Sequence, residues 1–416
     1  PILKQFFRIV LELGKYKIHF NFSKSGLYLE AYSKREIIYY MQVCHLTSVH
    51  PRFDPRIFYK ECLSLAQNGY TVVLAVRDGK DDEKYQGIKI INVGQVCSNR
   101  FFRIISNFYY ILANKTIKNS DIIHIHDPEL LPVGLLLRYL KKKIVIYDMH
   151  EDLPGQILEK DYLPNYLRPI FSHISKVVIH LCIRYYHGVI SAADFLTSQN
   201  ARYCKKSITI WNFPRVSQIK IKTDFSKHGI INILFIGNAY HGRSLEELAE
   251  ALKDERLRDK MVLTIIGTFD SDFYKKMMSI NSQDVRMVSE VKYEELANMI
   301  KDYDVGFVCD YSYSRNEYAI PTKLLEYSAA GLCVLAPNTP AVNKIVKEDR
   351  IGICVEPGNT SDILMGLLYL SNNREAIYNF CQAGVQAVNH KYSWEAQEHN
   401  LLELYQDIIT LHSRNE

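Results

Sequence analysis

Long apolar runs are missing from this 416-residue sequence. None approaches the roughly 20 residues that a membrane-spanning helix needs. The apolar and basic segment at the N-terminus also lacks the small-residue cleavage site of a signal peptide. We therefore expect a soluble or peripheral protein, located in the cytoplasm or at the inner face of the plasma membrane.

Cysteine pairs at metal-binding spacing and a strong charge imbalance are missing as well. The nine cysteines are scattered, mostly within apolar runs, and none forms a Cys-x-x-Cys pair. They read as reduced core residues of an intracellular protein. The formal charge is only +5, from 51 Lys and Arg against 46 Asp and Glu. This mild excess favours anionic ligands and does not by itself indicate nucleic acid, so we expect no nucleic-acid partner.

Apolar strand-like runs alternate with helical segments from Met41 onward, and 47% of the residues are hydrophobic. Continuous apolar strands separated by helices predict parallel sheets covered on both faces. The pattern pauses over the polar residues 212–229 and then resumes. The sequence therefore predicts an α/β protein with two Rossmann-like domains, whose ligands bind beyond the carboxyl ends of the strands. The predicted strands are 42–46, 71–76, 88–92, 122–126, 144–147, 189–191, 208–210, 230–236, 261–266, 285–288, 305–308, 332–336 and 353–355.

The positions where this alternation of strands and helices starts, pauses and ends divide the chain into five segments. Residues 1–40 fit no strand of the first domain and form an N-terminal extension, for which a membrane-bound amphipathic helix is the alternative. The last segment has apolar residues at helical spacing. The segments are 1–40, the first domain 41–213, a linker 214–229, the second domain 230–390 and a C-terminal helix 391–416.

The strongest local signal lies between Asn316 and Pro337, where a polar loop leads into a short helix and a buried strand. Pro321 suits the first turn of that helix, and the open N–H groups there, with Lys323 beside them, suit a phosphate group. Glu326 lies one turn later on the same face, where it can accept protons from ribose hydroxyls. The alternative is a solvated Lys–Glu pair on an ordinary αβ unit.

The run Pro-Thr-Lys-Leu-Leu-Glu-Tyr-Ser-Ala-Ala-Gly at 321–331 resembles the donor-site signature of retaining GT-B glycosyltransferases of family 4, especially capsule and O-antigen enzymes. A Glu-x7-Glu pattern is usual in that family. Glu326 matches its second glutamate, whereas Tyr318 takes the place of the first and Glu317 is one residue out of register. The resemblance covers Met41 to the C-terminus and implies two domains facing across a cleft, the first for the acceptor and the second for the nucleotide-sugar donor. The family's C-terminal helix packs back toward the first domain.

A glycine-rich loop, Gly237 to Ser244, follows the first strand of the second domain. It differs from a Walker A loop in one residue, since Arg243 stands where lysine belongs. A P-loop-like NTPase is therefore a serious alternative, although no magnesium-binding partner is obvious beyond Asp310. The resemblance implies instead that Arg243 holds the donor diphosphate. It assigns the donor-binding role to Gly237, Asn238, Val291, Tyr318, Pro321, Thr322 and Glu326.

Charged residues follow two strands of the first domain. In the loop from Ser48, Arg52 and Arg56 offer forked donors to phosphate or an acidic acceptor, while Asp54 either meets substrate or caps the next helix and pairs with Arg56. His126 and Asp127 end another strand. We expect them to form a polar rim facing the acceptor and to bind no metal, because no further His or carboxylate stands at ligand spacing.

The sharpest signal in the first domain is the polar run that follows strand 144–147, from Asp148 to Asp152. By resemblance, His150 matches a family histidine that lies close to the transferred sugar, whereas a structural histidine is the alternative. Asp148 either meets substrate or orients His150. We predict His150, Arg243 and Lys323 as catalytic residues. The acceptor-side residues are Arg52, Asp54, Arg56, His126, Asp127, Asp148 and Glu151.

Two stretches, 99–118 and 170–186, mix basic residues with aromatic and aliphatic ones. Such a stripe at helical spacing is more typical of a core, and binding to an anionic membrane surface is the alternative.

The sequence thus predicts a hexosyl- or other glycosyltransferase of the 2.4 enzyme class that acts in surface-polysaccharide assembly. Its donor is a nucleotide-diphosphate sugar, its acceptor a glycan or a polyprenyl-diphosphate-linked chain, and it needs no cofactor. Arg243 and Lys323 together stabilise the leaving diphosphate. A noncatalytic nucleotide-sugar-binding protein is a further alternative.

Overall fold

A computed structural model describes residues 16–23, 26–33, 41–160, 162–222, 229–289, 291, 299–310 and 318–415. The chain divides into two compact units. Unit 1 runs to Ile210 and takes in the chain again from Asn400, and unit 2 is Trp211–His399. The second boundary therefore falls inside the terminal helix α17 (Trp394–Asn415). The sequence predicts a first domain to residue 213, a linker 214–229 and a second domain 230–390, whereas unit 2 takes in the linker as well and spans Trp211–His399.

Unit 1 is built on an eight-stranded sheet. Its strands are β3 (Gln42–Leu46), β4 (Thr71–Val76), β5 (Glu83–Tyr85), β6 (Ile88–Asn92), β7 (Ile122–Ile125), β8 (Ile144–Met149), β9 (Gly188–Ser191) and β10 (Ser207–Thr209). They lie in the order β10-β9-β8-β7-β3-β4-β6-β5, and β5 alone runs antiparallel to its neighbour. The strand order reverses between β3 and β7, which makes their carboxyl ends the place where an open α/β sheet binds ligands.

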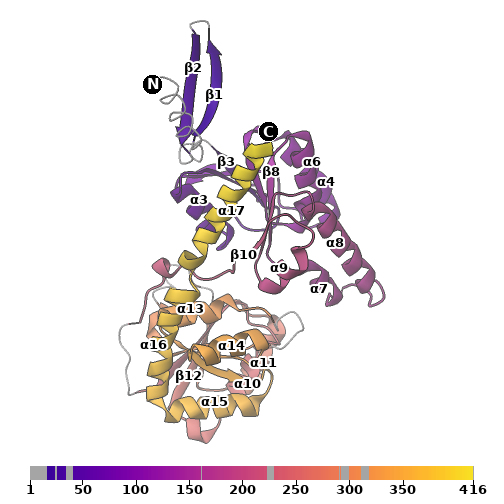
Figure 1. The fold of residues 1–416 in the computed structure, drawn as a ribbon. Helices are drawn as coiled ribbons and strands as arrows, with labels where there is room; N and C mark the ends of the chain where they lie inside the picture. The colour runs from indigo at the N-terminus through magenta and orange to yellow at the C-terminus, as the bar shows by residue number, and fades with distance from the viewer. Residues whose placement is uncertain are drawn as a thin grey trace, which may run out of the picture. The chain divides into compact units, whose positions relative to one another are not determined.

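Helical segments connect these strands (Figure 1). The first begins as a π-helical turn, η1 (Ile57–Cys62), and continues as α3 (Leu63–Gln67). The others are α4 (Arg100–Ala113), α5 (Lys115–Asn119), α6 (Leu131–Leu140), α7 (Leu153–Leu158), α8 (Arg168–Ile183) and α9 (Asp194–Asn200).

Unit 2 contains a six-stranded parallel sheet in the order β13-β12-β11-β14-β15-β16. The strands are β11 (Ile231–Ile236), β12 (Met261–Gly267), β13 (Val285–Ser289), β14 (Val305–Phe307), β15 (Cys333–Pro337) and β16 (Gly352–Val355). This is the doubly wound 3-2-1-4-5-6 arrangement, and its order reverses between β11 and β14. The helices are α10 (Leu245–Ala251), α11 (Ser271–Ile280), α13 (Thr322–Ala330), α14 (Pro340–Glu348), α15 (Thr360–Asn372) and α16 (Arg374–Lys391).

Both faces of the unit 2 sheet are covered, as continuous apolar strands require. Alternate residues of β11 point to opposite faces: Ile233 and Phe235 join one buried cluster, and Leu234 and Ile236 join the other. Residues of α10, α11 and α15 complete the first cluster, and residues of α13 and α14 complete the second. These helices surround the sheet in Figure 1. The predicted α/β architecture is confirmed.

The N-terminal extension differs from expectation where the structure describes it. β1 (Tyr16–Ser23) and β2 (Gly26–Ser33) pair as a two-stranded antiparallel sheet. The amphipathic-helix alternative is therefore wrong for these residues. Among the described residues, no helix combines the length and the apolar character that crossing a membrane requires.

The core interpretation of the two amphipathic stretches is also wrong for much of their surface. In α4, Phe102, Ile105 and Tyr109 are all more than half exposed, and in α8 Ile170, Ile174 and Leu181 are too. The helical spacing is present, but the apolar side of each helix is only partly covered by the rest of unit 1.

Candidate functional site

The carboxyl ends of β11 and β14 form the switch point of the unit 2 sheet, and the glycine-rich loop begins there. Gly237 has a φ of 142° and Gly242 a φ of 106°, both in the region that favours glycine. A side chain is also excluded at Gly267, where a Cβ would lie 2.0 Å from the carbonyl oxygen of Gly237. The loop backbone is thus held directly against the end of β12.

Arg243 is the cation of this loop. Its guanidinium forms an ion pair with Asp310, which follows β14, and lies 4.7 Å from the centroid of the Tyr240 ring. Its Nε is buried and has no hydrogen-bond partner among the described residues. About a quarter of the side chain is exposed. The pairing across β11 and β14 positions a charged fork at the switch point, where it can bind a phosphate group.

Ser244 distinguishes this loop from that of a P-loop NTPase. In such enzymes the serine hydroxyl coordinates magnesium. Here Ser244 is fully buried in a left-handed conformation, with a φ of 52°, and its Oγ accepts a hydrogen bond from the Gly358 N–H at 3.0 Å. The hydroxyl holds two parts of unit 2 together instead of facing a ligand.

Helix α13 begins at the same edge of the sheet. Pro321 is its N-cap residue, and no described side chain caps the open N–H groups of the first turn. Lys323 Nζ lies 2.7 Å from Glu326 Oε2, and both side chains remain about one-third exposed. This contact is the partly exposed Lys–Glu pair that the sequence analysis gave as the alternative, and it lies at a helix start of the kind that can bind a phosphate.

The remaining predicted donor-binding residues lie around these two elements. Asn238 Oδ1 accepts a hydrogen bond from Thr268 Oγ1 at 2.7 Å. Val291 packs against the cluster beneath α13 and α14. Tyr318 is 54% exposed, and Thr322 is half-buried at the first position of α13. Glu317 lies outside the described residues.

Sequence reasoning gave Asp310 no role toward Arg243 and overlooked Tyr327. Asp310 directly follows an apolar strand, which is a usable signal. No signal in the sequence points to a special role for Tyr327, because a tyrosine on the buried side of a helix is common in a hydrophobic core.

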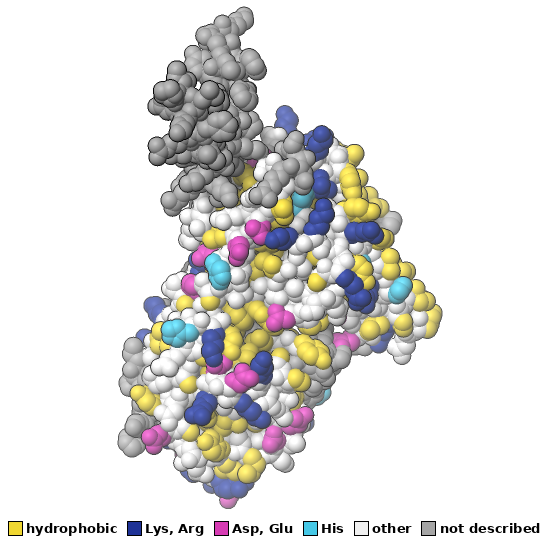
Figure 2. Space-filling view, viewed as in Figure 1, with side chains coloured by type: hydrophobic (Ala, Val, Ile, Leu, Met, Phe, Trp, Pro, Cys, Tyr) yellow, Lys and Arg dark blue, Asp and Glu magenta, His cyan; other side chains and the backbone are white. Residues whose placement is uncertain are grey.

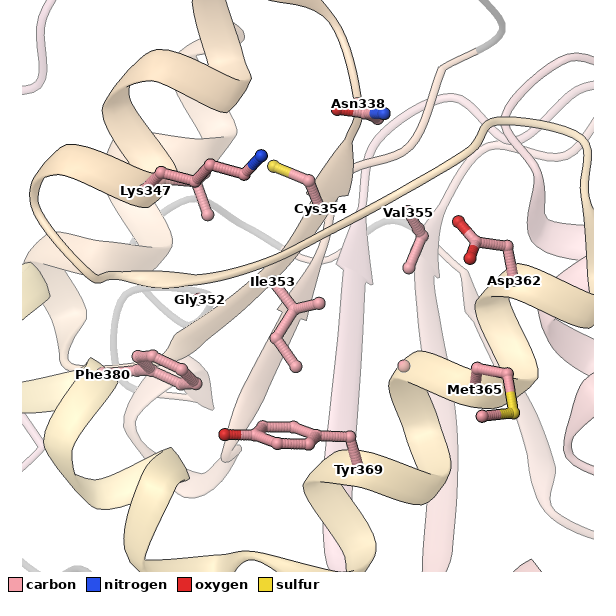
Figure 3. A pocket seen from close by; sticks show the side chains of 12 residues that line it. Asn338, Lys347, Gly352, Ile353, Cys354, Val355, Asp362, Met365, Tyr369 and Phe380 are labelled. Atoms are coloured by element: carbon pink, nitrogen blue, oxygen red, sulfur yellow. The ribbon is translucent and has the colours of Figure 1, made fainter.

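A separate pocket of about 530 Å³ lies over the outer edge of the unit 2 sheet (Figure 3). Side chains from β16 and from α14, α15 and α16 line it, among them Lys347, Asp362 and Tyr369. None of the predicted donor-binding residues contributes to it.

In unit 1, Asp148 organises the predicted acceptor-side residues. Its carboxylate receives two hydrogen bonds from Arg56, at 2.7 and 2.8 Å, and its Oδ2 lies 2.8 Å from His150 Nε2. The last distance supports the alternative in which Asp148 orients His150. Arg56 is buried and also donates to the Ile210 carbonyl oxygen at 2.9 Å, so its guanidinium is engaged within the unit.

Most of the other acceptor-side residues have partners inside unit 1. Asp54 Oδ1 accepts from the N–H groups of Arg56 and Ile57, which is the capping role weighed for it. Arg52 is buried against Asp78 and Glu83. Asp127 and Glu151 also accept hydrogen bonds: the first from Thr47 Oγ1 and the Ser48 N–H, the second from Gln156.

The pKa values of several side chains in this cluster differ strongly from their ordinary values because of their surroundings. Burial acts to raise the pKa of Asp148, but the charge of Arg56 and the hydrogen bonds of His126 and His150 hold it well below its usual range. Burial lowers the pKa of His126 to about 4. Burial, followed by the negative charge of Asp148, raises the pKa of Glu61 well above its usual value.

No metal was expected because no further His or carboxylate stands at ligand spacing from His126 and Asp127 along the sequence, and this reasoning was wrong. The fold brings His45 and Glu61 next to His124 and His126, all four fully or almost fully buried. His45 lies on a different strand and Glu61 on a helical turn, so spacing along the sequence did not reveal them.

The comparisons with known proteins fit this geometry. Residues 218–386 match the family Glycosyl transferases group 1. A search among curated proteins found no match.

Solved structures resemble the chain over most of its length. A sucrose-phosphate synthase from Thermosynechococcus elongatus superposes with a TM-score of 0.71 at 15% identity, over 89% of this chain and 100% of that one. A glycosyltransferase from Rickettsia africae gives 0.67 at 14% identity, over 89% and 98%. Anabaena HepE in complex with UDP and glucose gives 0.65 at 10%, over 88% and 100%. The fold is that of GT-B glycosyltransferases, with two Rossmann-like domains.

Proposed function

We propose that this chain is a retaining glycosyltransferase that moves a hexosyl group from a nucleotide-diphosphate sugar to a glycan or polyprenyl-diphosphate-linked acceptor. The acceptor class fits family 4 enzymes of capsule and O-antigen assembly. Unit 2 takes the donor. The observation that carries the proposal is the switch point of unit 2, where Arg243 and the start of α13 with Lys323 stand at one sheet edge, inside the region matched by the family.

The chemistry follows from charge. Negative charge grows on the diphosphate as the sugar–oxygen bond breaks, so a guanidinium, an ammonium and helix N–H groups fixed in advance stabilise the transition state more than the ground state. Glu326 is the acceptor for ribose hydroxyl protons. The complex of Anabaena HepE with UDP and glucose supports testing UDP-sugars first.

A thermal-shift panel of UDP-, GDP- and dTDP-sugars tests donor binding and identifies the base. The stabilising nucleotide sugar is then incubated with bacterial lipid and glycan extracts, and free nucleotide is measured. We expect release only when an acceptor is present. Binding without release in any extract would favour the noncatalytic alternative, and an inverted anomeric centre in the product, seen by NMR, would contradict the retaining mode.

The NTPase alternative makes a different prediction about magnesium. We propose that turnover needs no added cofactor, because Arg243 and Lys323 supply the positive charge that magnesium supplies in an NTPase. Sugar transfer should therefore persist in EDTA with magnesium omitted. Loss of nucleotide release in EDTA, restored by magnesium alone, would favour the NTPase.

We further propose that unit 1 binds an anionic membrane through α8, which would bring it to a lipid-linked acceptor. Its exposed apolar side chains recur at intervals of three and four residues and so form one stripe, flanked by the exposed Lys176 and Arg184. The stripe consists of Ile170, Phe171, Ile174, Val177, Val178 and Leu181 of α8, and Tyr185 lies two residues after the end of the helix. Figure 2 shows hydrophobic side chains gathered along the edge of unit 1 where α7 and α8 lie, with Lys and Arg side chains nearby.

Flotation with lipid vesicles tests this surface. Wild-type protein should float with vesicles that contain phosphatidylglycerol and float less at high salt. Ile174→Ser with Leu181→Ser should reduce flotation by at least ~10-fold, since each aliphatic side chain buried in the membrane contributes about 1.5 kcal/mol or more. Met278→Ser, at an exposed apolar position on α11, is the matched control. Concentration-dependent dimerisation that the double substitution abolishes, without flotation, would assign the stripe to a second copy of the chain.

A further inference from the structure

Four buried side chains of unit 1 converge on one point below the rim that carries His150. They are His45, Glu61, His124 and His126, and their solvent exposure is 0, 0, 0 and 2%. One nitrogen or oxygen from each lies within 4.8 Å of those from the other three. Three imidazoles and a carboxylate form a donor set typical of a transition-metal site.

The fold brings these residues together from three separate segments. His45 of β3 pairs with His124 of β7 in the parallel register, and His126 follows on the same face because strand side chains alternate. Glu61 comes from η1, where the Glu61 N–H bonds the Arg56 carbonyl oxygen in the wider winding of a π-helix. Such turns occur frequently at functional sites.

The distances suit tetrahedral coordination. Glu61 Oε2 lies 3.9 Å from His45 Nδ1, 3.8 Å from His124 Nδ1 and 4.0 Å from His126 Nε2, and His45 Nδ1 lies 2.9 Å from His126 Nε2. An ion with ligands at about 2.0–2.1 Å holds them roughly 3.3 Å apart in a tetrahedron. Small side-chain movements therefore convert the observed cluster into a coordination shell.

Glu61 is buried beside Arg56 without a hydrogen bond of its own among the described residues. It is fully buried, and neither carboxylate oxygen has a hydrogen-bond partner among the described residues. Oε1 lies 3.1 Å from Arg56 Nε, but that guanidinium donates its hydrogen bonds to Asp148 and Ile210. A buried carboxylate without hydrogen bonds costs several kcal/mol unless another group compensates it.

The surrounding groups resemble the support that metal ligands usually have. His126 presents Nε2 to the cluster while its Nδ1 lies 3.2 Å from His150 Nε2 and 3.4 Å from Asp148 Oδ2. A carboxylate on the far side of a histidine ligand fixes the ring and its tautomer. On the other side, the Tyr405 hydroxyl lies 2.8 Å from His124 Nδ1. An ion bound at this nitrogen displaces that hydrogen bond.

We propose that His45, Glu61, His124 and His126 bind a structural zinc ion inside unit 1. All four positions of the ion are occupied by protein, as in closed structural sites. The ion fixes β3, β7 and η1 to one another and, through His126, the Asp148–His150 pair at the rim. It takes no part in sugar transfer, so the proposal stands independently of the function proposed above.

The competing explanation is a metal-free cluster in which Glu61 is neutral. The two explanations differ for Glu61→Gln, since glutamine has the shape of a neutral glutamic acid but is a poor zinc ligand. With zinc, the substitution removes the ion and destabilises unit 1. Without zinc, it leaves stability nearly unchanged.

The experiment measures zinc in the full chain, unfolded with chelator and refolded with excess ZnCl2 after purification without nickel resin. Wild-type protein should retain about one zinc per chain after gel filtration, and Glu61→Gln at least ~10-fold less. Glu246→Gln, at another buried glutamate, is the matched control and should retain zinc. Tyr405→Phe should retain zinc too, because it removes a competitor of the ion and no ligand. Equal zinc content in wild type and Glu61→Gln, with equal stability, would overturn the proposal.

Should Glu61→Gln fail to fold, wild-type protein alone decides. X-ray absorption at the zinc edge should show nitrogen and oxygen neighbours at about 2.0–2.1 Å with the scattering pattern of several imidazoles. Refolding with Co²⁺ should give the intense visible bands of a tetrahedral site. A zinc spectrum without imidazole neighbours, or no bound ion at all, would refute the site.

Discussion

The hydroxyl oxygen of Tyr327 accepts a hydrogen bond from the backbone N–H of Ile236 at 2.8 Å. Tyr327 is fully buried in α13, and Ile236 is the last residue of β11. The bond therefore fixes the helix that carries Lys323 and Glu326 to the strand that leads into the Arg243 loop. A single side chain thus couples the two halves of the candidate donor site.

Tyr327→Phe should lower the stability of unit 2. The substitution keeps the ring and leaves the buried Ile236 N–H without a partner, which costs about 1–3 kcal/mol. Both tryptophans of the chain, Trp211 and Trp394, belong to unit 2, so their fluorescence during urea unfolding reports on this unit. Tyr274→Phe, at an exposed tyrosine of α11, serves as the control and should leave the midpoint unchanged.

Gly306→Ala should destabilise unit 2 by steric overlap. A Cβ at Gly306 in β14 would lie 2.2 Å from Cδ2 of the Tyr327 ring and 2.7 Å from its Cβ. Because the ring is buried, strand and helix must separate, at a cost of about 1–3 kcal/mol or more. Gly366→Ala, whose nearest contact would be 3.0 Å from a Val355 methyl group, should cost less. An equal loss for both would mean that α13 moves freely against β14.

Substitutions of Arg243 and Glu326 should have different effects: the first on transition-state stabilisation and the second on nucleotide binding. Arg243→Ala should lower kcat by about 10²–10³-fold, as expected when a preorganised charge at the leaving group is removed. Glu326→Ala should mainly weaken nucleotide binding, by about 10-fold, through the lost ribose contact. Steady-state kinetics and calorimetric titration with the nucleotide measure the two effects. Arg256→Ala, in an exposed ion pair of unit 2, should change neither.

His187 should contribute to a loss of unit 1 stability on mild acidification. Its Nδ1 accepts a hydrogen bond from the Val145 N–H at 3.0 Å, and burial, with the positive charge of Arg138 next, lowers its pKa to about 4. The unfolded chain binds a proton near pH 6.5, whereas the folded chain does not until about pH 4. The contribution of His187 to the free energy of unfolding is therefore fully present above pH 6.5 and declines toward pH 4, by on the order of 1 kcal/mol after solvent screening.

His187→Asn tests this assignment, because the asparagine carbonyl can accept the same hydrogen bond without titrating. Thermal unfolding followed by circular dichroism should show a smaller decrease in Tm between pH 7 and 5 for this variant than for wild type. His173→Asn, at an exposed position of α8, should follow wild type. Parallel Tm curves for wild type and His187→Asn would refute the role of His187.

The sequence by itself determined the two-unit α/β architecture and the strands from β3 onward except β5, but not the β1–β2 pair. Apolar runs such as 42–46 and 71–76 became β3 and β4 with the expected bounds, because a strand buried on both faces must be apolar throughout. Pro321 lies at the N-cap of α13, directly before the first turn in which it was expected, and Gly331 ends the helix in the left-handed conformation at a φ of 86°. These features depend on neighbours in the chain, which a sequence displays directly.

Only the tertiary structure decided which polar groups from distant parts of the chain meet. Arg243 forms an ion pair with Asp310 because the order of the sheet places β14 beside β11. His45 lies close to Glu61 and His126 in a sheet in which β3 is the neighbour of β7. The tertiary structure also decided that Arg52 and Arg56 are buried against carboxylates and that the apolar stripe of α8 stays exposed. Strand order and helix packing are set by the summed burial of the whole chain, so contacts between distant residues leave little trace in the spacing of any one segment.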